Sequence, residues 1–391
     1  YKKSNEILKE IQDIDFGVIG NVELTRIKFS NLSLGKLANE AELSLIVNKL
    51  IAQIEKGLEL DLNNNIDRKE EKLLILKIIY NISPFVLDDM NNTVLFRTLY
   101  DKSLVIYNYF KLNSLNDSYV SYLINVFNRK AFLFTEPAMA IIYYDEAENY
   151  FKTNNILEEL IVTYASKAGM LIDLGSYGEA IKYCNLALNL IYDKKIIIPL
   201  KEKIYNNLYI AEFLKSEKSL KNNGDEIALA YYTIDKLSKL LTVEANGKNH
   251  VILTNLASLF LYVDDIDNYE KIKTVIQLSL DCDDVSNIND LSINDFYRYH
   301  FGWFEFFKNL KMHKFDICLN ICSSLNGFYP SIFHNHKKMD LRVEAALYLA
   351  QKKLNPTSKE LCLNFLKYAQ SNKFYESRAL LLSDLQFTLF E

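Results

Sequence analysis

The chain has 391 residues, of which 49% are apolar and 24% are charged, and this composition excludes disordered, collagen-like and disulfide-scaffold proteins. Its 45 basic and 50 acidic residues give a formal net charge of −5, so the chain has no broad cationic field for binding nucleic-acid backbones. The 11 glycines and 5 prolines are too few for turn-rich β folds or for folds with glycine-rich nucleotide loops. Together these features predict an all-α protein.

The first part of the chain is predicted to be a small helical N-terminal segment. Polar turn-forming residues at 61–67 interrupt the helical periodicity, so we place a domain boundary there, between residues 1–66 and residues 67–391. The stretch from Leu37-Ala38 to Ile54-Glu55-Lys56-Gly57 resembles a degenerate helix-turn-helix of the phage-repressor type. If this segment binds DNA, its candidate contacts are Arg26, Lys28 and Lys49. An ordinary helical segment remains the alternative, because residues 1–57 carry eight basic and eight acidic side chains and so lack a cationic surface.

From residue 67 onward, one amphipathic helical pattern follows another, separated by short polar stretches. The clearest repeated unit runs from Tyr164 to Leu190. Its small residues Ala168 and Ala180 would let two antiparallel helices approach closely, and Gly175 would supply the turn between them. The unit resembles a tetratricopeptide (TPR) repeat in the spacing of Tyr164, Ala168, Leu171, Gly175, Tyr177, Ala180, Cys184 and Ala187.

Weaker copies of this unit occur around Asn207, around Asn255, from Phe315 to Cys322 and near Ala350. We therefore expect the TPR-like domain to be a right-handed superhelix of antiparallel helical hairpins. We also expect residues 374–390 to form a capping helix at its end.

The sequence contains no recognisable catalytic motif. It lacks a phosphate-binding glycine loop, a GxSxG nucleophile motif and an HExxH metal motif, so we expect neither an enzyme nor a cofactor. The five cysteines form no CxxC pair and fit buried, reduced thiols, and His334 with His336 is too short a signature for a metal site. The chain has no bilayer-spanning apolar run and no hydrophobic signal core, which predicts a cytoplasmic protein. Because it begins with Tyr1 and not Met, we expect it to be a fragment.

A peptide-binding groove is the chemistry that the pattern favours. In stacked hairpins the first helices line the inner wall, and an asparagine side chain there can donate to and accept from an extended peptide backbone. The candidate backbone contacts are Asn207, Asn255 and Asn206, and the candidates for binding a peptide carboxylate are Arg298, Lys308 and Arg342. Because the chain is rich in asparagine, solvated or capping roles are the alternative for each amide.

A TPR array behind a degenerate helix-turn-helix resembles the RRNPP family of bacterial peptide-pheromone sensors. The resemblance rests on the unit from Tyr164 to Leu190 and its weaker copies, over roughly residues 150–370. It implies a short signalling peptide in the concave groove, a homodimer, and a conformational change that controls transcription, with DNA bound by the N-terminal segment or by a domain before Tyr1. Two alternatives remain open: a TPR adaptor, such as a phosphatase-like protein that binds a response regulator without binding DNA, and a helical enzyme.

Overall fold

The computed structural model of the chain describes residues 45–52, 69–84, 86, 93–112, 118–129, 137–198, 200–217, 223–241, 250–280, 282–287, 295–312 and 314–325. These residues form helices and connecting turns without any strand, which confirms the predicted all-α character. Arg26, Lys28, Arg342 and the predicted capping helix at 374–390 lie outside the described residues. None of the helices within the described ranges has the length and apolar character needed to cross a membrane.

The chain divides into two compact units, residues 1–128 and residues 129–391. The boundary that the sequence predicted after residue 66 lies outside the described residues and stays a prediction. The division falls further along because α4, α5 and α6 pack on one another. The described helices of the first unit are a short stretch at residues 45–52, α4 (Lys69–Pro84), α5 (Thr93–Leu112) and α6 (Ser118–Asn128).

An aromatic cluster holds the helices of the first unit together. The Phe127 ring of α6 lies 6.2 Å from the Tyr80 ring of α4, and 6.1 and 6.3 Å from the Phe96 and Tyr100 rings of α5, with edge-to-face geometry. Such pairs add specific attraction to the burial of apolar area.

Of the three predicted DNA contacts, Lys49 is the one that the structure describes. It lies exposed on the helical stretch at residues 45–52.

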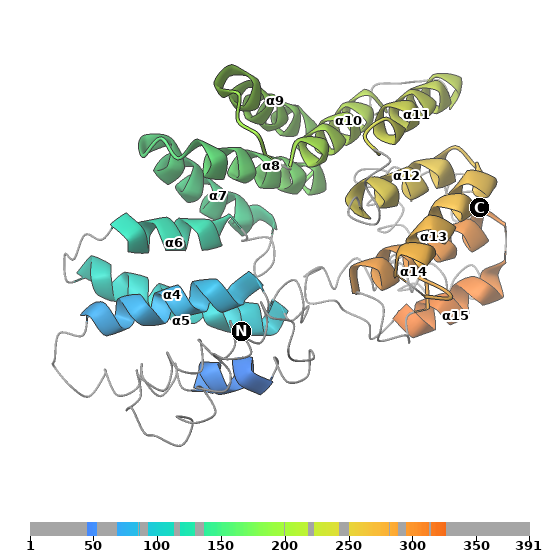
Figure 1. Ribbon diagram of the computed structural model, residues 1–391. Helices are drawn as coiled ribbons and strands as arrows, with labels where there is room; N and C mark the ends of the chain where they lie inside the picture. Colours follow the sequence, from blue (N-terminus) through green and yellow to red (C-terminus); the bar gives the residue numbers. More distant parts are fainter. Residues whose placement is uncertain are drawn as a thin grey trace, which may run out of the picture. The chain divides into compact units, whose positions relative to one another are not determined.

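The second unit is a row of helical hairpins (Figure 1). Helices α8 and α9, α10 and α11, α12 and α13, and α14 and α15 pack in pairs, and the first helices α8, α10, α12 and α14 also contact one another in that order. The helices are α7 (Pro137–Thr153), α8 (Leu157–Asp173), α9 (Tyr177–Lys194), α10 (Lys201–Glu217), α11 (Asn223–Ser238), α12 (His250–Tyr262), α13 (Ile266–Leu280), α14 (Asp295–Lys311) and α15 (Phe315–Leu325).

The hairpin of α8 and α9 has the packing that the repeat pattern predicts. Ala168 and Ala180 are fully buried, which lets the two helices approach closely. The predicted turn is present: Gly175 has a φ of 74° and its backbone nitrogen donates to the carbonyl of Ile172. Asp264, in the corresponding turn between α12 and α13, also has a positive φ, of 66°.

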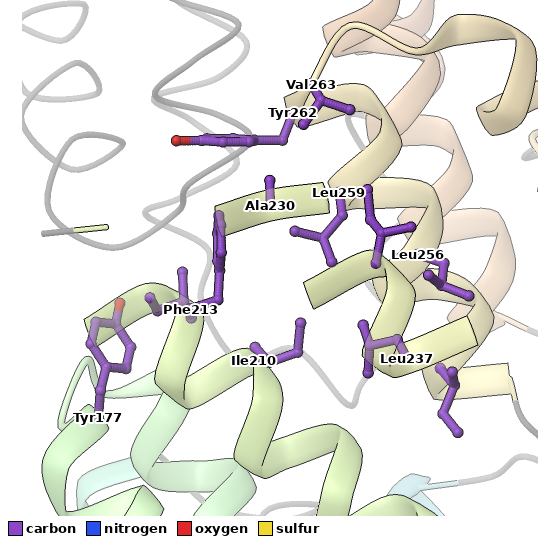
Figure 2. Packing of buried hydrophobic residues seen from close by; sticks show 12 residues of the cluster. Tyr177, Ile210, Phe213, Ala230, Leu237, Leu256, Leu259, Tyr262 and Val263 are labelled. Atoms are coloured by element: carbon purple, nitrogen blue, oxygen red, sulfur yellow. The ribbon is translucent and has the colours of Figure 1, made fainter. Parts of the chain in front are cut away.

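One apolar core joins successive hairpins of the second unit, as Figure 2 shows. It begins at Tyr177 of α9 and continues through Phe213 of α10 and Ala230 of α11 to Tyr262 of α12. The rings of Phe213 and Tyr262 meet edge to face with centroids 5.4 Å apart. Because side chains from four helices share this core, neighbouring hairpins stabilise one another.

We expect Gly175→Ala to lower the free energy of unfolding by about 1–2 kcal/mol, because a Cβ is strained in the left-handed conformation of this turn. The matched control is Gly178→Ala in α9, where an added Cβ would meet nothing within 4 Å. That control should be neutral or stabilising by up to about 1 kcal/mol, since alanine is the better helix former. Urea unfolding of both variants measures the difference. Equal effects at the two positions would contradict the turn assignment.

Candidate functional site

Three asparagines of α10 and α12 form a chain of hydrogen-bonded amides, which we call the amide chain. The Nδ2 of Asn255 donates to the Oδ1 of Asn206 at 3.0 Å, and the Nδ2 of Asn206 donates to the Oδ1 of Asn207 at 3.4 Å. The Nδ2 of Asn207 then donates to the backbone carbonyl of Ala165 in α8 at 3.1 Å. The amide chain therefore links the first helices of three consecutive hairpins.

The carbonyl of Ala165 fixes the direction of every amide in the chain. A backbone carbonyl can only accept, so Asn207 must point its Nδ2 at it and its Oδ1 toward Asn206. Asn206 must therefore direct its Nδ2 at Asn207 and its Oδ1 at Asn255. Asn255 donates its Nδ2 to that oxygen, which leaves its own Oδ1 at the end of the amide chain. That oxygen accepts no hydrogen bond from the residues that the structure describes. The site thus presents an acceptor to any bound group.

The three amides differ in exposure. Asn206 is 1% exposed and Asn207 is 7% exposed, whereas Asn255 is only half-buried. A buried amide without a partner is costly, so the inner two asparagines hold the helices together and orient the third. Asn255 is the member that a ligand can reach. The sequence predicted all three residues as peptide contacts but gave no sign of their different exposure.

Two of the predicted cations, Arg298 and Lys308, lie within the described residues, and both belong to α14. Arg298 is buried within α14. The Nζ of Lys308 lies 2.8 Å from the Oε1 of Glu270 and 2.5 Å from the Oε2 of Glu305, so its charge is balanced by carboxylates of its own chain. We therefore see no support among the described residues for a carboxylate clamp beside Asn255.

A buried lysine, which sequence reasoning missed, joins α7, α8 and α9. The Nζ of Lys167 in α8 donates to Asp145 at 2.5 Å, to Glu148 at 2.8 Å and to the hydroxyl of Tyr183 at 2.6 Å. Burial alone would lower the pKa of Lys167, but these hydrogen bonds outweigh it and hold the pKa above its ordinary value. The ammonium group therefore stays protonated, which suits a structural link and not a nucleophile.

A second ionic network joins α13 to α14 around Glu305. Its Oε1 accepts from Lys273 at 3.1 Å and from the hydroxyl of Tyr269 at 2.9 Å, and Lys308 pairs with its other oxygen. Burial acts to raise the pKa of Glu305, but the positive charges of Lys273 and Lys308 outweigh it and lower that pKa. Glu305 is therefore a charged, paired group at neutral pH.

The cysteines and the metal-binding residue types give no site in the part of the chain that the structure describes. No group of histidine, cysteine, aspartate and glutamate side chains there could hold a metal ion. The thiols of Cys184 and Cys318 are buried, and burial raises the pKa of each to about 12, so they remain protonated and unreactive. His334 and His336 lie outside the described residues.

Comparisons with models of protein families, with curated proteins and with solved structures gave no match to this chain. The site must therefore be interpreted from its own geometry.

Proposed function

We propose that the unit formed by residues 129–391 binds a short extended peptide across α8, α10 and α12, with Asn255 as the principal backbone contact. The supporting observation is the amide chain, whose fixed direction leaves the Oδ1 of Asn255 as an oriented acceptor. A peptide N–H would donate to this oxygen. The second hydrogen on its Nδ2 could be donated to a neighbouring peptide carbonyl.

The proposed ligand is recognised through its backbone and not through a terminal carboxylate. Lys308 is paired with two carboxylates of the chain, and Arg298 is buried. Neighbouring packed helices lie about 8–10 Å apart, so three first helices span about 20 Å. An extended peptide advances about 3.3 Å per residue, so about six residues would cross the site.

The regulatory part of the proposal follows from the RRNPP resemblance. A peptide that bridges three hairpins would favour whichever arrangement of those hairpins it contacts best. That shift in population would control transcription through DNA binding, in a homodimer, with Lys49 as a contact on the first unit. The competing proposal is an adaptor that binds a protein partner without DNA.

To test the binding site, peptides are selected from a randomised hexapeptide library on the full chain, and their affinities are measured by calorimetry. Asn255→Ala should weaken binding about tenfold, since it removes hydrogen bonds worth about 1.4 kcal/mol. The control is Asn154→Ala, because Asn154 is exposed and its side chain donates only to the carbonyl of Tyr150. Binding should be unchanged in this control.

Asn255 is preferable to Asn207 for this test because truncating Asn207 would remove both the acceptor of Asn206 and the donor to the Ala165 carbonyl, whereas truncating Asn255 removes only the donor to Asn206. Circular dichroism should show the helical content of Asn255→Ala to be unaltered. The proposal fails if the variant binds the selected peptides as tightly as the parent chain, or if no peptide is selected.

A further inference from the structure

A row of tyrosines and lysines crosses α9, α10 and α11, and we call it the tyrosine–lysine surface. It consists of Tyr192, Lys201, Tyr205, Tyr209, Tyr232 and Lys236. Each member contacts at least one other member, and these contacts connect all six. The hydroxyl oxygens of Tyr192 and Tyr205 lie 2.6 Å apart, and the rings of Tyr205 and Tyr209 have centroids 5.7 Å apart. The surface is therefore one continuous feature and not a set of scattered side chains.

The two lysines lie over the tyrosine rings. The Nζ of Lys201 is 4.7 Å from the centroid of the Tyr192 ring. The Nζ of Lys236 is 4.7 Å from that of Tyr209 and 4.5 Å from that of Tyr232. Cation–π contacts of this kind hold both ammonium groups in place. Both lysines are half-buried, and the Lys236 side chain is 26% exposed. The two positive charges are therefore held in fixed positions over tyrosine rings.

This surface is distinct from the amide chain, although α10 contributes to both. Lys201, Tyr205 and Tyr209 recur at intervals of four residues, which places them on one face of the helix. At about 100° per residue, Asn206 and Asn207 are rotated by about 100° and 200° from Tyr205. The two surfaces could therefore be occupied independently.

The tyrosine–lysine surface is open and its positive charge is incompletely balanced. Tyr192 is 52% exposed and Tyr232 is 57% exposed. Lys201 forms no ion pair with the residues that the structure describes, and the one carboxylate near Lys236 is Glu212, at 3.7 Å. Ile197, in the connection between α9 and α10, is 98% exposed.

We propose that the tyrosine–lysine surface docks an acidic segment of a partner protein. Carboxylates of that segment would pair with Lys201 and Lys236 and accept from the tyrosine hydroxyls, while an apolar side chain would cover Ile197. Tyrosine and isolated exposed aliphatic residues suit protein interfaces, where a few such side chains carry most of the binding energy. A nucleic-acid strand fits less well, since the lysines already occupy faces of the rings on which bases would stack.

The test uses a fluorescein-labelled peptide of repeated Glu-Leu-Glu triplets, with anisotropy as the readout. The two comparison probes, labelled in the same way, are a peptide of repeated Lys-Leu-Lys triplets and an oligothymidylate. The acidic peptide should bind the full chain, and binding should weaken with added salt. Lys201→Glu with Lys236→Glu should weaken it at least about tenfold, equivalent to about 1.4 kcal/mol.

The matched control reverses the charges of Lys182, on α9, and of Lys239, in the turn that follows α11; both lysines are exposed and lie outside the tyrosine–lysine surface. Affinity in this control should stay within about twofold, or about 0.4 kcal/mol. Should the first pair fail to fold, Tyr232→Ala gives a second test, because it truncates an exposed side chain. The proposal is overturned if the acidic peptide does not bind, if neither test variant weakens its binding, or if the lysine peptide or the oligothymidylate binds as tightly.

Discussion

Replacing Lys167 with Met is expected to lower the free energy of unfolding of the second unit by about 3–5 kcal/mol, the usual cost of removing one partner from a buried ionic network. The Lys167 side chain is 4% exposed, and that of Glu148 is 20% exposed. Methionine fills much of the same volume, so the loss comes from leaving Glu148 and the Tyr183 hydroxyl without their buried partner. Urea unfolding of the full chain, followed by far-ultraviolet circular dichroism, measures the effect.

Two further variants separate charge from packing in this network. Lys182→Met removes an exposed ion pair with Glu179 and should cost no more than about 1 kcal/mol. Lys167→Met combined with Glu148→Leu removes both buried charges and should recover much of the lost stability. If Lys167→Met costs no more than Lys182→Met, then Lys167 is not the link between α7, α8 and α9 that its contacts indicate.

The hairpin packing of α8 and α9 was predictable because it depends on residues close together in sequence. Small residues at 168 and 180 and the glycine at 175 report directly on how two adjacent helices approach and turn. The division after Asn128 was not predictable in this way. It depends on which helices α4, α5 and α6 contact, and amphipathic periodicity says that a helix has a buried face without saying what covers it.

The sequence proposed the three asparagines of the amide chain as peptide contacts, but it did not predict the hydrogen bonds among them. Asn206, Asn207 and Asn255 were proposed from the repeat pattern. The hydrogen bond between Asn255 and Asn206, however, joins positions 49 apart in the sequence. The direction of the amides follows from a carbonyl that no sequence pattern marks. Lys308 was predicted from the sequence to bind a peptide carboxylate. In the structure it is paired with acids contributed by α13 and α14, which no local sequence pattern indicated.

The tyrosine–lysine surface left a signal in the sequence that was overlooked. Lys201, Tyr205 and Tyr209 are spaced by four residues on α10, and such spacing places side chains on one helical face. The contribution of Tyr192 and Lys236 could not be read in the same way, because they belong to the helices that precede and follow α10. A stripe on one helix is visible in sequence, whereas a surface that crosses three helices requires the fold.

Glu305→Gln should lower the free energy of unfolding at pH 7 by about 2 kcal/mol, since hydrogen bonds to charged groups contribute about 1.5–3 kcal/mol. Glutamine keeps the shape of the side chain but removes the charge that Lys273 and Lys308 share. Trp303, the single tryptophan of the chain, is buried in α14 close to Glu305, so its fluorescence reports unfolding in this region.

The difference in the free energy of unfolding between the wild-type chain and Glu305→Gln should depend on pH, and its sign can be predicted. The positive charges of Lys273 and Lys308 outweigh burial and lower the pKa of Glu305 in the folded chain, below the value of about 4.3 expected when it is unfolded. Stability from the charged carboxylate is therefore fully present well above that unfolded value, and it is lost as the pH falls through the folded pKa. The gap between wild type and Glu305→Gln should be largest near neutral pH and should shrink below about pH 5. A gap that stays constant down to about pH 4, or that widens there, would show that the charge of Glu305 does not stabilise the packing of α13 against α14.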